Sequence, residues 1–450
     1  MIRYEFLSGI ESVNPLIMWF IFITSLMYMY FLLKKERKSY ITYFFIYISI
    51  GGIFEYLGQT IFRIYEISII LYVFSLVMKH RKINSKFIIG FCLFSILYLI
   101  MVFWHKPEAL FSDLRQYFIY LFPLFVFIFL YMRVDMINRN DEILKIQQIL
   151  KVQIFASILK FFLIGMNEKM VGILTISGAG VATFFPVLFF MLCWYLKHGN
   201  LQKADWKWVF LSLLVPIVSN KRAVWFFFPA TIFIFYFVYN KIKHSKKAIY
   251  IVFLIPFIVY FGARINPTLN PEKAVFGSFD LEYIIQYITE YNLGGNKDVN
   301  IEYATGRMGG NSFFWEKVKR ELFSEEILFG YGNETYNEYG GKDERNISKF
   351  GFRSKFMLTG WNEILVRCGL IVLIPFIIIM FSLLSMHTKR KDILLFTIVF
   401  LFSFIFYAGV ISTNFLLSSI FIFLIVINTQ KMKYYQSIKK NKSINKEEKE

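Results

Sequence analysis

The chain has 450 residues, of which 57% are hydrophobic and 20% aromatic, and its mean hydropathy is positive at +0.52. A soluble protein confines its apolar residues to periodic stripes, whereas the run "YFIYLFPLFVFIFLYM" at 117–132 is apolar on every helical face. The composition therefore excludes an ordinary soluble protein and predicts an all-α polytopic integral membrane protein. The net charge of +19 is divided among short clusters between apolar runs, so we expect no nucleic-acid binding.

Apolar runs of membrane-spanning length recur along the chain. The first segment, "MIRYEFLSGIESVNP", lacks the apolar core and cleavage site of a signal peptide, so we expect the first span to stay in the mature protein. We predict about 12–13 transmembrane helices, at 14–33, 39–57, 64–79, 86–104, 117–132, 149–166, 173–196, 207–220, 223–240, 248–262, 362–385, 393–410 and 412–428. No internal repeat and no matched pair of broken helices is visible.

Clusters of basic residues fall at alternate connections: "KKERK" at 34–38, "KHRK" at 79–82, "KIKHSKK" at 241–247, "TKRK" at 388–391 and the Lys-rich tail at 429–450. Cytoplasmic loops carry such an excess of Lys and Arg. This pattern predicts an external N-terminus and a cytoplasmic C-terminus. It also places the turn "SNKRA" at 219–223 outside.

The predicted organisation has four parts: transmembrane helices at 1–262, one large extracytoplasmic loop at 263–360, the last transmembrane helices at 361–428 and a basic cytoplasmic tail at 429–450. Within the loop, the stretches at 281–291 and 311–323 repeat apolar residues at intervals of three and four. They predict amphipathic helices on the membrane surface or over a cavity. The stretch at 332–346, rich in Gly, Asn and charge, predicts a mobile loop.

Some cations in or near the apolar runs are not explained by the basic cytoplasmic clusters: Arg63, Arg115, Lys160, Lys221, Arg222, Arg264 and Arg367. Apart from Lys160, they fall near external ends of spans. Taken singly, each of these cations has a simpler interpretation: its side chain extends to interfacial water or to a lipid phosphate. Together they predict a site for an anion, because positive charge outside runs against the orientation rule. We expect Arg222, Arg264 and Arg307 of the loop to converge on a diphosphate, which matches the guanidinium fork.

Other residues have simpler expected roles. Glu363 and Arg367 have the i,i+4 spacing of a structural ion pair, and Lys160 is expected to pair inside the bundle with an unidentified partner. The five histidines lie in short loops as ordinary solvated residues, and the three cysteines are expected to be buried and unpaired. No Walker loop, dinucleotide fingerprint, metal-ligand spacing or nucleophile elbow is present, so we expect no cofactor and no metal.

Three stretches resemble the O-antigen polymerase and O-antigen ligase superfamily of bacterial surface-polysaccharide assembly. "SNKRAVW" is similar to its Ser-x-x-Arg turn, "TGRMGGNSFFWEKVKRELFSEEILFGYG" to its loop pattern of Arg, Trp and a final "FGxG", and "WNEILVRCGLIVLIP" to the Asn-led start of the helix that closes the loop. Ligases of this superfamily carry a His before that Asn, and Trp361 stands there instead. This departure favours a polymerase and leaves the general base open.

The resemblance implies a GT-C-like fold in the bacterial cytoplasmic membrane and polymerisation of polyprenyl-diphosphate-linked oligosaccharide repeat units, by inverting transfer with the lipid diphosphate as leaving group. It implies the lipid-linked oligosaccharide and the bilayer as partners, with a chain-length regulator and a flippase of the same pathway. Arg222, Arg264 and Arg307 are the expected phosphate contacts, with Glu363 as a candidate base. The other expected substrate contacts are Lys221, Arg367, Trp315, Tyr331, Trp361 and Asn362.

Two alternatives remain open. A ligase that transfers a finished glycan to another acceptor would share most of these residues. A flippase or other transporter of lipid-linked glycans would also have many helices and intramembrane charge, but a late external domain would be unusual in it.

Overall fold

The structure is a computed structural model that describes residues 13–34, 39–78, 85–105, 110–133, 139–165, 171–176, 179–198, 205–240, 246–293, 307–332 and 359–385, with 415–416, 419–420, 422–424 and 426. These residues are mostly helical, and among them there is no strand, only one isolated bridge. The expected all-α fold is confirmed for this part of the chain.

The helices are α1 (Pro15–Leu33), α2 (Tyr40–Ser49), α3 (Gly51–Tyr56), α4 (Gln59–Met78), α5 (Ser85–Trp104), α6 (Leu110–Arg133), α7 (Arg139–Ile164), η3 (Ala179–Phe184), α8 (Phe185–His198), α9 (Lys207–Ser212), α10 (Leu214–Val218), α11 (Val224–Asn240), α12 (Lys246–Ile265), α13 (Leu281–Leu293), α14 (Arg307–Arg320), α15 (Glu325–Phe329) and α17 (Gly360–Ser385).

Three described helical segments are both long and apolar enough to cross a membrane: Pro15–Leu33, Asp141–Ile164 and Gly360–Ile378. Shorter apolar helices lie between them along the chain. A helix can cross hydrocarbon because its backbone groups bond one another. The full number of spans stays a prediction. The expected span 393–410 lies outside the described residues, and the span 412–428 is described only at 415–416, 419–420, 422–424 and 426, which are helical. The basic clusters between helices lie mostly outside the described residues, as do the tail and most of the expected mobile loop.

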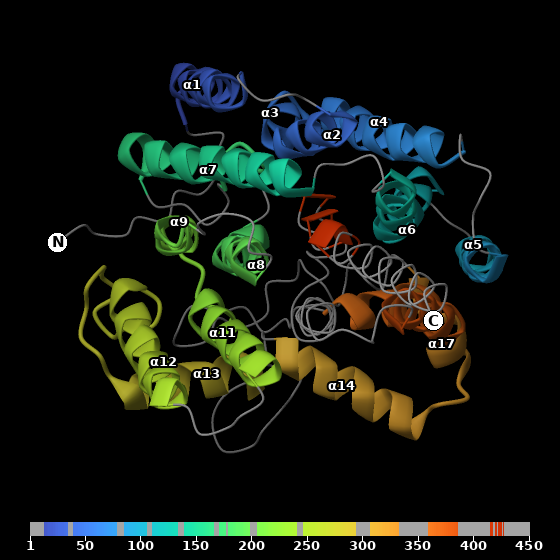
Figure 1. The fold of residues 1–450 in the computed structure, drawn as a ribbon. Coiled ribbons are helices and arrows are strands. Elements are labelled where there is room, and N and C mark those ends of the chain that lie inside the picture. Colours follow the sequence, from blue (N-terminus) through green and yellow to red (C-terminus); the bar gives the residue numbers. More distant parts are fainter. Residues whose placement is uncertain are drawn as a thin grey trace, which may run out of the picture.

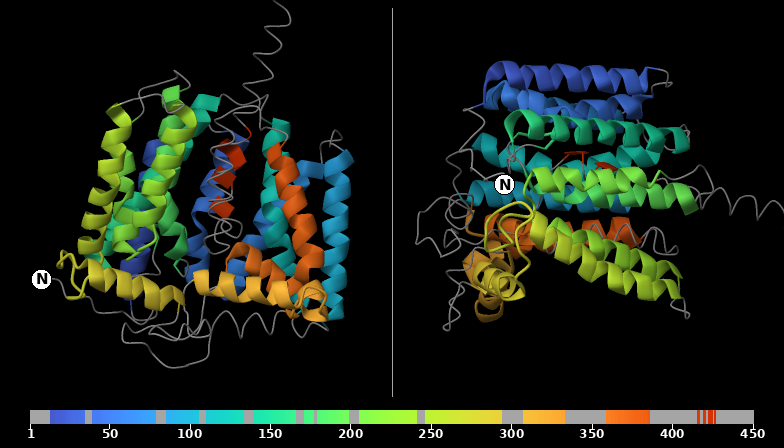
Figure 2. Two further views of the ribbon diagram at one scale, coloured as in Figure 1. Left: turned by 90° about the horizontal axis from the view of Figure 1, so that it is seen from below. Right: turned by 90° about the vertical axis from the view of Figure 1, so that its left-hand side faces the viewer.

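Most helices run side by side, while α13 and α14 lie across one end of this bundle (Figure 1; Figure 2, left). We call this the capped end. Both stretches expected to be amphipathic are helical, and α13 buries Ile284 and Tyr287 while exposing Leu281 and Ile285. The apolar residues of α13 therefore lie on two sides of the helix, and only one of these sides faces the bundle.

Side-chain contacts identify which helix ends meet at the capped end. His105, just after α5, bonds the carbonyl of Phe329 in α15, and Gln116 near the start of α6 bonds Glu363 near the start of α17. Arg222, between α10 and α11, contacts Tyr287 of α13. These are the ends that the charge pattern predicts to be outside.

Three expected spans are interrupted, contrary to the prediction of continuous helices. The span 39–57 divides at Ile50 into α2 and α3, and the span 207–220 divides at Leu213 into α9 and α10. The span 173–196 becomes helical only at Ala179, because residues 171–176 form a tight turn closed by a bridge between Val171 and Thr175. Hydropathy averages over these breaks, since the interrupted segments are as apolar as the helices.

The 171–176 turn is buried, and side chains from α7 satisfy its backbone. The Gln153 Oε1 accepts from the Ile173 N–H at 2.8 Å, and the Ser157 Oγ accepts from the Gly172 N–H at 2.9 Å. The Lys160 ammonium donates to the Gly172 carbonyl. This carbonyl is the partner that the sequence did not identify for Lys160. Non-helical backbone in a membrane protein is tolerated where protein groups replace the missing bonds in this way.

The break between α2 and α3 receives the same turn. The Gly52 N–H donates to the Ile173 carbonyl at 2.9 Å, and a Cβ at Gly52 would lie 2.7 Å from that oxygen. Glu55 Oε2 accepts from the Thr175 hydroxyl at 2.9 Å and from the Ile176 N–H at 2.7 Å. The helix break therefore makes room for the turn, and Glu55 anchors it.

Candidate functional site

The turn that presents Lys221 and Arg222 is a helix C-cap. The Lys221 N–H bonds the Pro216 carbonyl at 2.8 Å and the Asn220 N–H bonds the Ile217 carbonyl at 3.0 Å, while Asn220 has a φ of 49°. This pair of bonds, with a left-handed residue after the helix, is a Schellman motif. It ends α10 at the capped end, reverses the chain, and places both cations before α11.

Arg222 lies against α13. Its guanidinium carbon is 5.1 Å from the centre of the Tyr287 ring, and Tyr287 is only 5% exposed. A guanidinium is attracted to the negative face of an aromatic ring, so this contact positions the Arg222 side chain against α13. Lys221, the neighbouring expected contact, is partly exposed beside it. The turn therefore carries two adjacent cations beneath the amphipathic helix.

Arg264 has different surroundings from those expected. Its Nε donates to the Gly277 carbonyl at 2.9 Å, and its guanidinium lies near Tyr260, one turn earlier on α12. The face of α12 toward α11 is marked by Gly262, where a Cβ would lie 2.3 Å from the Trp225 ring. Two helical positions turn the side chain by about 200°, so Arg264 points away from α11 and its described contacts hold the 266–280 connection. Convergence of Arg222 and Arg264 on one anion stays a prediction, and the described contacts of Arg264 lie on α12 and the 266–280 connection.

Arg307, the third expected phosphate contact, is the first residue of α14. Its side chain lies outside the described part. The backbone of α14 is fixed one turn later, where Asn311 Oδ1 accepts from the Thr359 hydroxyl at 2.7 Å and from Asn362 Nδ2 at 2.6 Å. Arg307 thus begins the helix that joins the cap to α17.

The start of α17 holds a buried polar cluster, which includes the expected residues Asn362, Glu363 and Arg367. Arg367 Nη2 lies 3.5 Å from Glu363 Oε1, so the predicted ion pair is confirmed. Gln116 Nε2 of α6 donates to the same oxygen at 3.4 Å. One turn deeper on α6, the fully buried Tyr120 lies within electrostatic range of Glu363 and Arg367. The Glu363 carboxylate therefore joins α6 to α17 through side-chain contacts.

The "FGxG" stretch, at 329–332, forms the junction between α15 and α17. Gly330 and Gly369 both have positive φ, 85° and 70°, and a Cβ on Gly369 would lie 2.2 Å from the Leu328 carbonyl. The Tyr331 N–H donates to the Val366 carbonyl at 2.6 Å. These glycines allow two backbones to touch at the kink of α17. For Gly330, the first glycine of the motif, this is a physical reason that involves no ligand.

The aromatic residues expected to stack on sugars differ in burial and in their neighbours. Tyr331 is half-buried, and its hydroxyl accepts from Lys317 Nζ at 3.1 Å. Trp315 lies on the outer face of α14, 54% exposed, beneath the ammonium of Lys319. Trp361 is half-buried at the start of α17, packed against the core. Two of the three are joined to α17, which carries the polar cluster: Trp361 belongs to this helix, and the Tyr331 N–H bonds the Val366 carbonyl.

The structure gives no support for placing two further cations, Arg115 and Arg63, in the expected anion site. Arg115 makes a bidentate pair with Glu66, at 2.6 and 2.8 Å, which removes the reason to assign it to an external anion. Arg63 is exposed on α4, which agrees with the alternative of an interfacial side chain.

Sequence reasoning missed four residues of the capped end. Gln116 and Tyr120 join the polar cluster of α17, Asn220 forms the turn before the cations, and His105 bonds the Phe329 carbonyl at 3.0 Å instead of being a solvated loop residue. Polar residues within an apolar run are a usable signal for Gln116. The roles of Tyr120 and His105 depend on neighbours far along the chain, so no local pattern indicates them.

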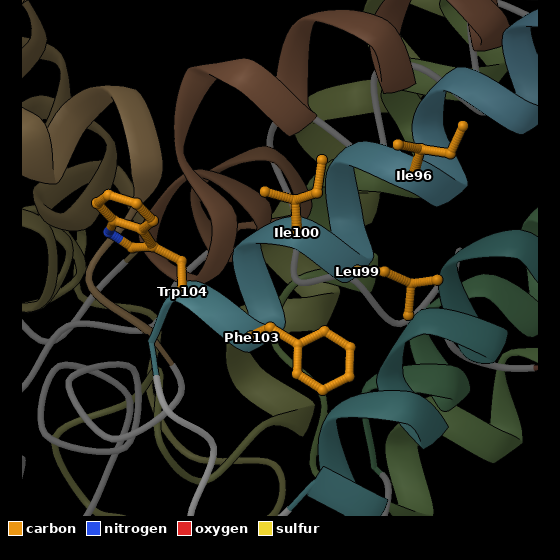
Figure 3. A pocket seen from close by; sticks show the side chains of 5 residues that line it. All are labelled: Ile96, Leu99, Ile100, Phe103 and Trp104. Atoms are coloured by element: carbon orange, nitrogen blue, oxygen red, sulfur yellow. The ribbon is translucent and has the colours of Figure 1, made fainter.

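A shallow apolar hollow lies along α5 (Figure 3). It is lined by Ile96, Leu99, Ile100, Phe103 and Trp104. With only apolar walls, it suits a lipid chain and has no group for chemistry.

No family model, no curated protein and no solved structure matches the chain.

Proposed function

We propose that this protein polymerises polyprenyl-diphosphate-linked oligosaccharide repeat units into a surface polysaccharide at the outer face of the bacterial cytoplasmic membrane. One observation carries the proposal. Arg222 and Lys221 are presented by a rigid turn at the bundle end that α13 and α14 cover, and the polar start of α17 lies at that same end. An anionic headgroup at the membrane surface and a covering cap are what a lipid-diphosphate donor needs.

In the proposed reaction, the growing glycan is bound through its reducing-end anomeric carbon to a lipid diphosphate. A hydroxyl oxygen of the next lipid-linked unit forms a bond to that carbon from the opposite face. The bond between the carbon and the phosphate oxygen breaks, and the electron pair leaves with the diphosphate. The hydroxyl proton goes to a base or to solvent. The anomeric configuration is inverted, and no nucleotide sugar is used.

The residue roles follow from the surroundings. Arg222 and Lys221 stabilise the diphosphate, with Arg307 as a further phosphate contact across the cap. Arg264 contributes by holding the 266–280 connection beside the site. Arg367 and Gln116 both contact the Glu363 carboxylate, so we assign Glu363 and Arg367 to positioning α17. Asn362, Trp361, Tyr331 and Trp315 remain candidate sugar contacts. The proposal requires no cofactor and no metal.

A transporter of lipid-linked glycans is the second candidate, and one observation favours it. The break at Ile50 and the buried 171–176 turn beside it place non-helical backbone inside the bundle, as discontinuous helices of transporters do. Transfer of a finished glycan by a ligase is the other enzyme reading, and Trp361 in place of the ligase His speaks against it.

Purified protein in lipid nanodiscs, supplied with lipid-diphosphate-linked repeat units alone, distinguishes these functions. A polymerase yields a ladder of longer glycans, whereas a transporter reconstituted in vesicles only moves the lipid across the bilayer. Arg222→Ala is expected to lower the rate of ladder formation at least about 100-fold, as removal of one charge-stabilising group does at other sites. Arg320→Ala is the matched control, because Arg320 lies on the same cap with its side chain 78% exposed. Equal ladders from both variants would contradict the site.

A further inference from the structure

Asn220 carries a buried amide with no bonding partner among the described residues. The residue is 1% exposed, and neither Nδ2 nor Oδ1 has a hydrogen-bond partner. A buried donor and acceptor left unbonded destabilise the folded protein. A ligand or a buried water is therefore needed to complete this position.

The left-handed backbone allows asparagine as well as glycine, but it gives the buried amide of Asn220 no partner. Asn220 occupies the left-handed position after α10, with a φ of 49°. Glycine is the usual residue there because it has no Cβ. Glycine would form the same turn without burying a polar side chain. We therefore look for a binding function of the Asn220 amide.

The neighbours of the amide indicate the class of ligand. Lys221 and Arg222 follow directly, so an anion is favoured beside it. Nδ2 can donate to an anion oxygen, but Oδ1 can only accept and would repel one. A ligand that satisfies both atoms has a hydrogen-bond donor next to its anionic group. A sugar bound to a diphosphate has this combination, since its hydroxyl or acetamido N–H lies beside the phosphates.

We propose that Asn220 binds the junction between the first sugar and the diphosphate of the donor, with Nδ2 on a phosphate oxygen and Oδ1 on a sugar donor. This inference rests on the proposed function and adds a specificity-determining residue to the same site. The amide atoms are covered in the structure, and Arg222 lies against Tyr287 of α13, which spans this end of the bundle. Entry of the donor therefore requires the groups over the turn to move.

The test compares two probes: a short-chain polyprenyl diphosphate, and the same lipid diphosphate carrying one sugar. Wild-type protein is expected to bind the glycosylated probe about tenfold more tightly, as one hydrogen bond to a buried group supplies. Asn220→Gly keeps the turn and is expected to reduce this preference to about one, with an unliganded Tm equal to or above the wild type. Asn220→Asp keeps the turn and is expected to weaken both probes by adding negative charge.

The outcomes separate this inference from the proposed function. An unchanged preference in Asn220→Gly, with a raised Tm, means that the amide holds only a buried water and overturns the inference. Failure of the wild type to bind either probe also overturns it. A third outcome is that the preference for the glycosylated probe depends on Asn220 but the protein makes no ladder of longer glycans. This result supports the sugar–diphosphate site and rejects the polymerase.

Discussion

Lys160 is a fully buried cation, 1% exposed, on a helix long and apolar enough to cross a membrane. A buried charge is tolerated when polar groups surround it. Here its ammonium meets the Gly172 carbonyl, and Glu55 lies within electrostatic range while anchoring the other side of the same turn. The residue thus connects α7, the 171–176 turn and the α2–α3 break.

Lys160→Met is expected to lower the free energy of unfolding by about 1–3 kcal/mol, because the Gly172 carbonyl loses its described donor. The measurement is the shift in Tm of the detergent-solubilised protein. Lys151→Met is the control on the same helix, since Lys151 is only partly buried and lies over the Trp208 ring. If both variants lose the same stability, Lys160 does not hold the turn.

At the scale of elements, the contact between α15 and α17 fixes where the loop returns to the bundle. Gly330 and Gly369 meet through their backbones, and Gly332 lies against the His105 ring. Three elements far apart in the sequence therefore join at the capped end. The start of α17, with Asn362 and Glu363, is oriented by this junction.

Gly369→Ala is expected to destabilise the protein by several kcal/mol, because strain at a positive φ costs about 1–3 kcal/mol and the new Cβ also meets the Leu328 carbonyl. Gly58→Ala is the matched control: its φ is also positive, at 125°, but no atom lies within 4 Å of the added Cβ. Thermal unfolding of both variants separates the two effects. A Gly369→Ala variant no less stable than Gly58→Ala would mean that the backbones do not touch.

On the scale of the whole molecule, the helices have two distinct ends. Thr42 near the start of α2 bonds Glu142 near the start of α7 at 2.9 Å, so these helices begin together, at the end opposite the cap. The charge pattern of the sequence predicts that this end is cytoplasmic and the capped end external.

Cysteine labelling tests this orientation. In a variant without the three natural cysteines, Glu316→Cys on α14 is expected to react with a membrane-impermeant maleimide in intact spheroplasts. Tyr40→Cys at the start of α2 is expected to react only after permeabilisation. Both positions are exposed, at 50% for the Glu316 side chain and 72% for Tyr40. The reverse pattern would invert the topology and place the Arg222 turn inside.

Local patterns sufficed for several features. Continuous apolar runs predicted the helices α1, α5 and α11 to within one residue at each end. They also predicted α7, but this helix begins ten residues before its expected start at 149. Period-3.6 repeats predicted α13 and α14, and i,i+4 spacing predicted the pair of Glu363 with Arg367. These features depend on residues close together in the chain, so the sequence alone carries them.

Other features depend on partners that no local pattern contains. Arg115 and Arg222 look alike in sequence, yet one pairs with Glu66 and the other lies against Tyr287. The same holds for the breaks in the expected spans 39–57 and 173–196, which accompany the 171–176 turn that Gly52, Glu55 and Lys160 contact. The sequence by itself determined a helical membrane protein with cations at one set of helix ends. Only the tertiary structure decided which cations acids neutralise, because that depends on contacts between residues distant in the chain.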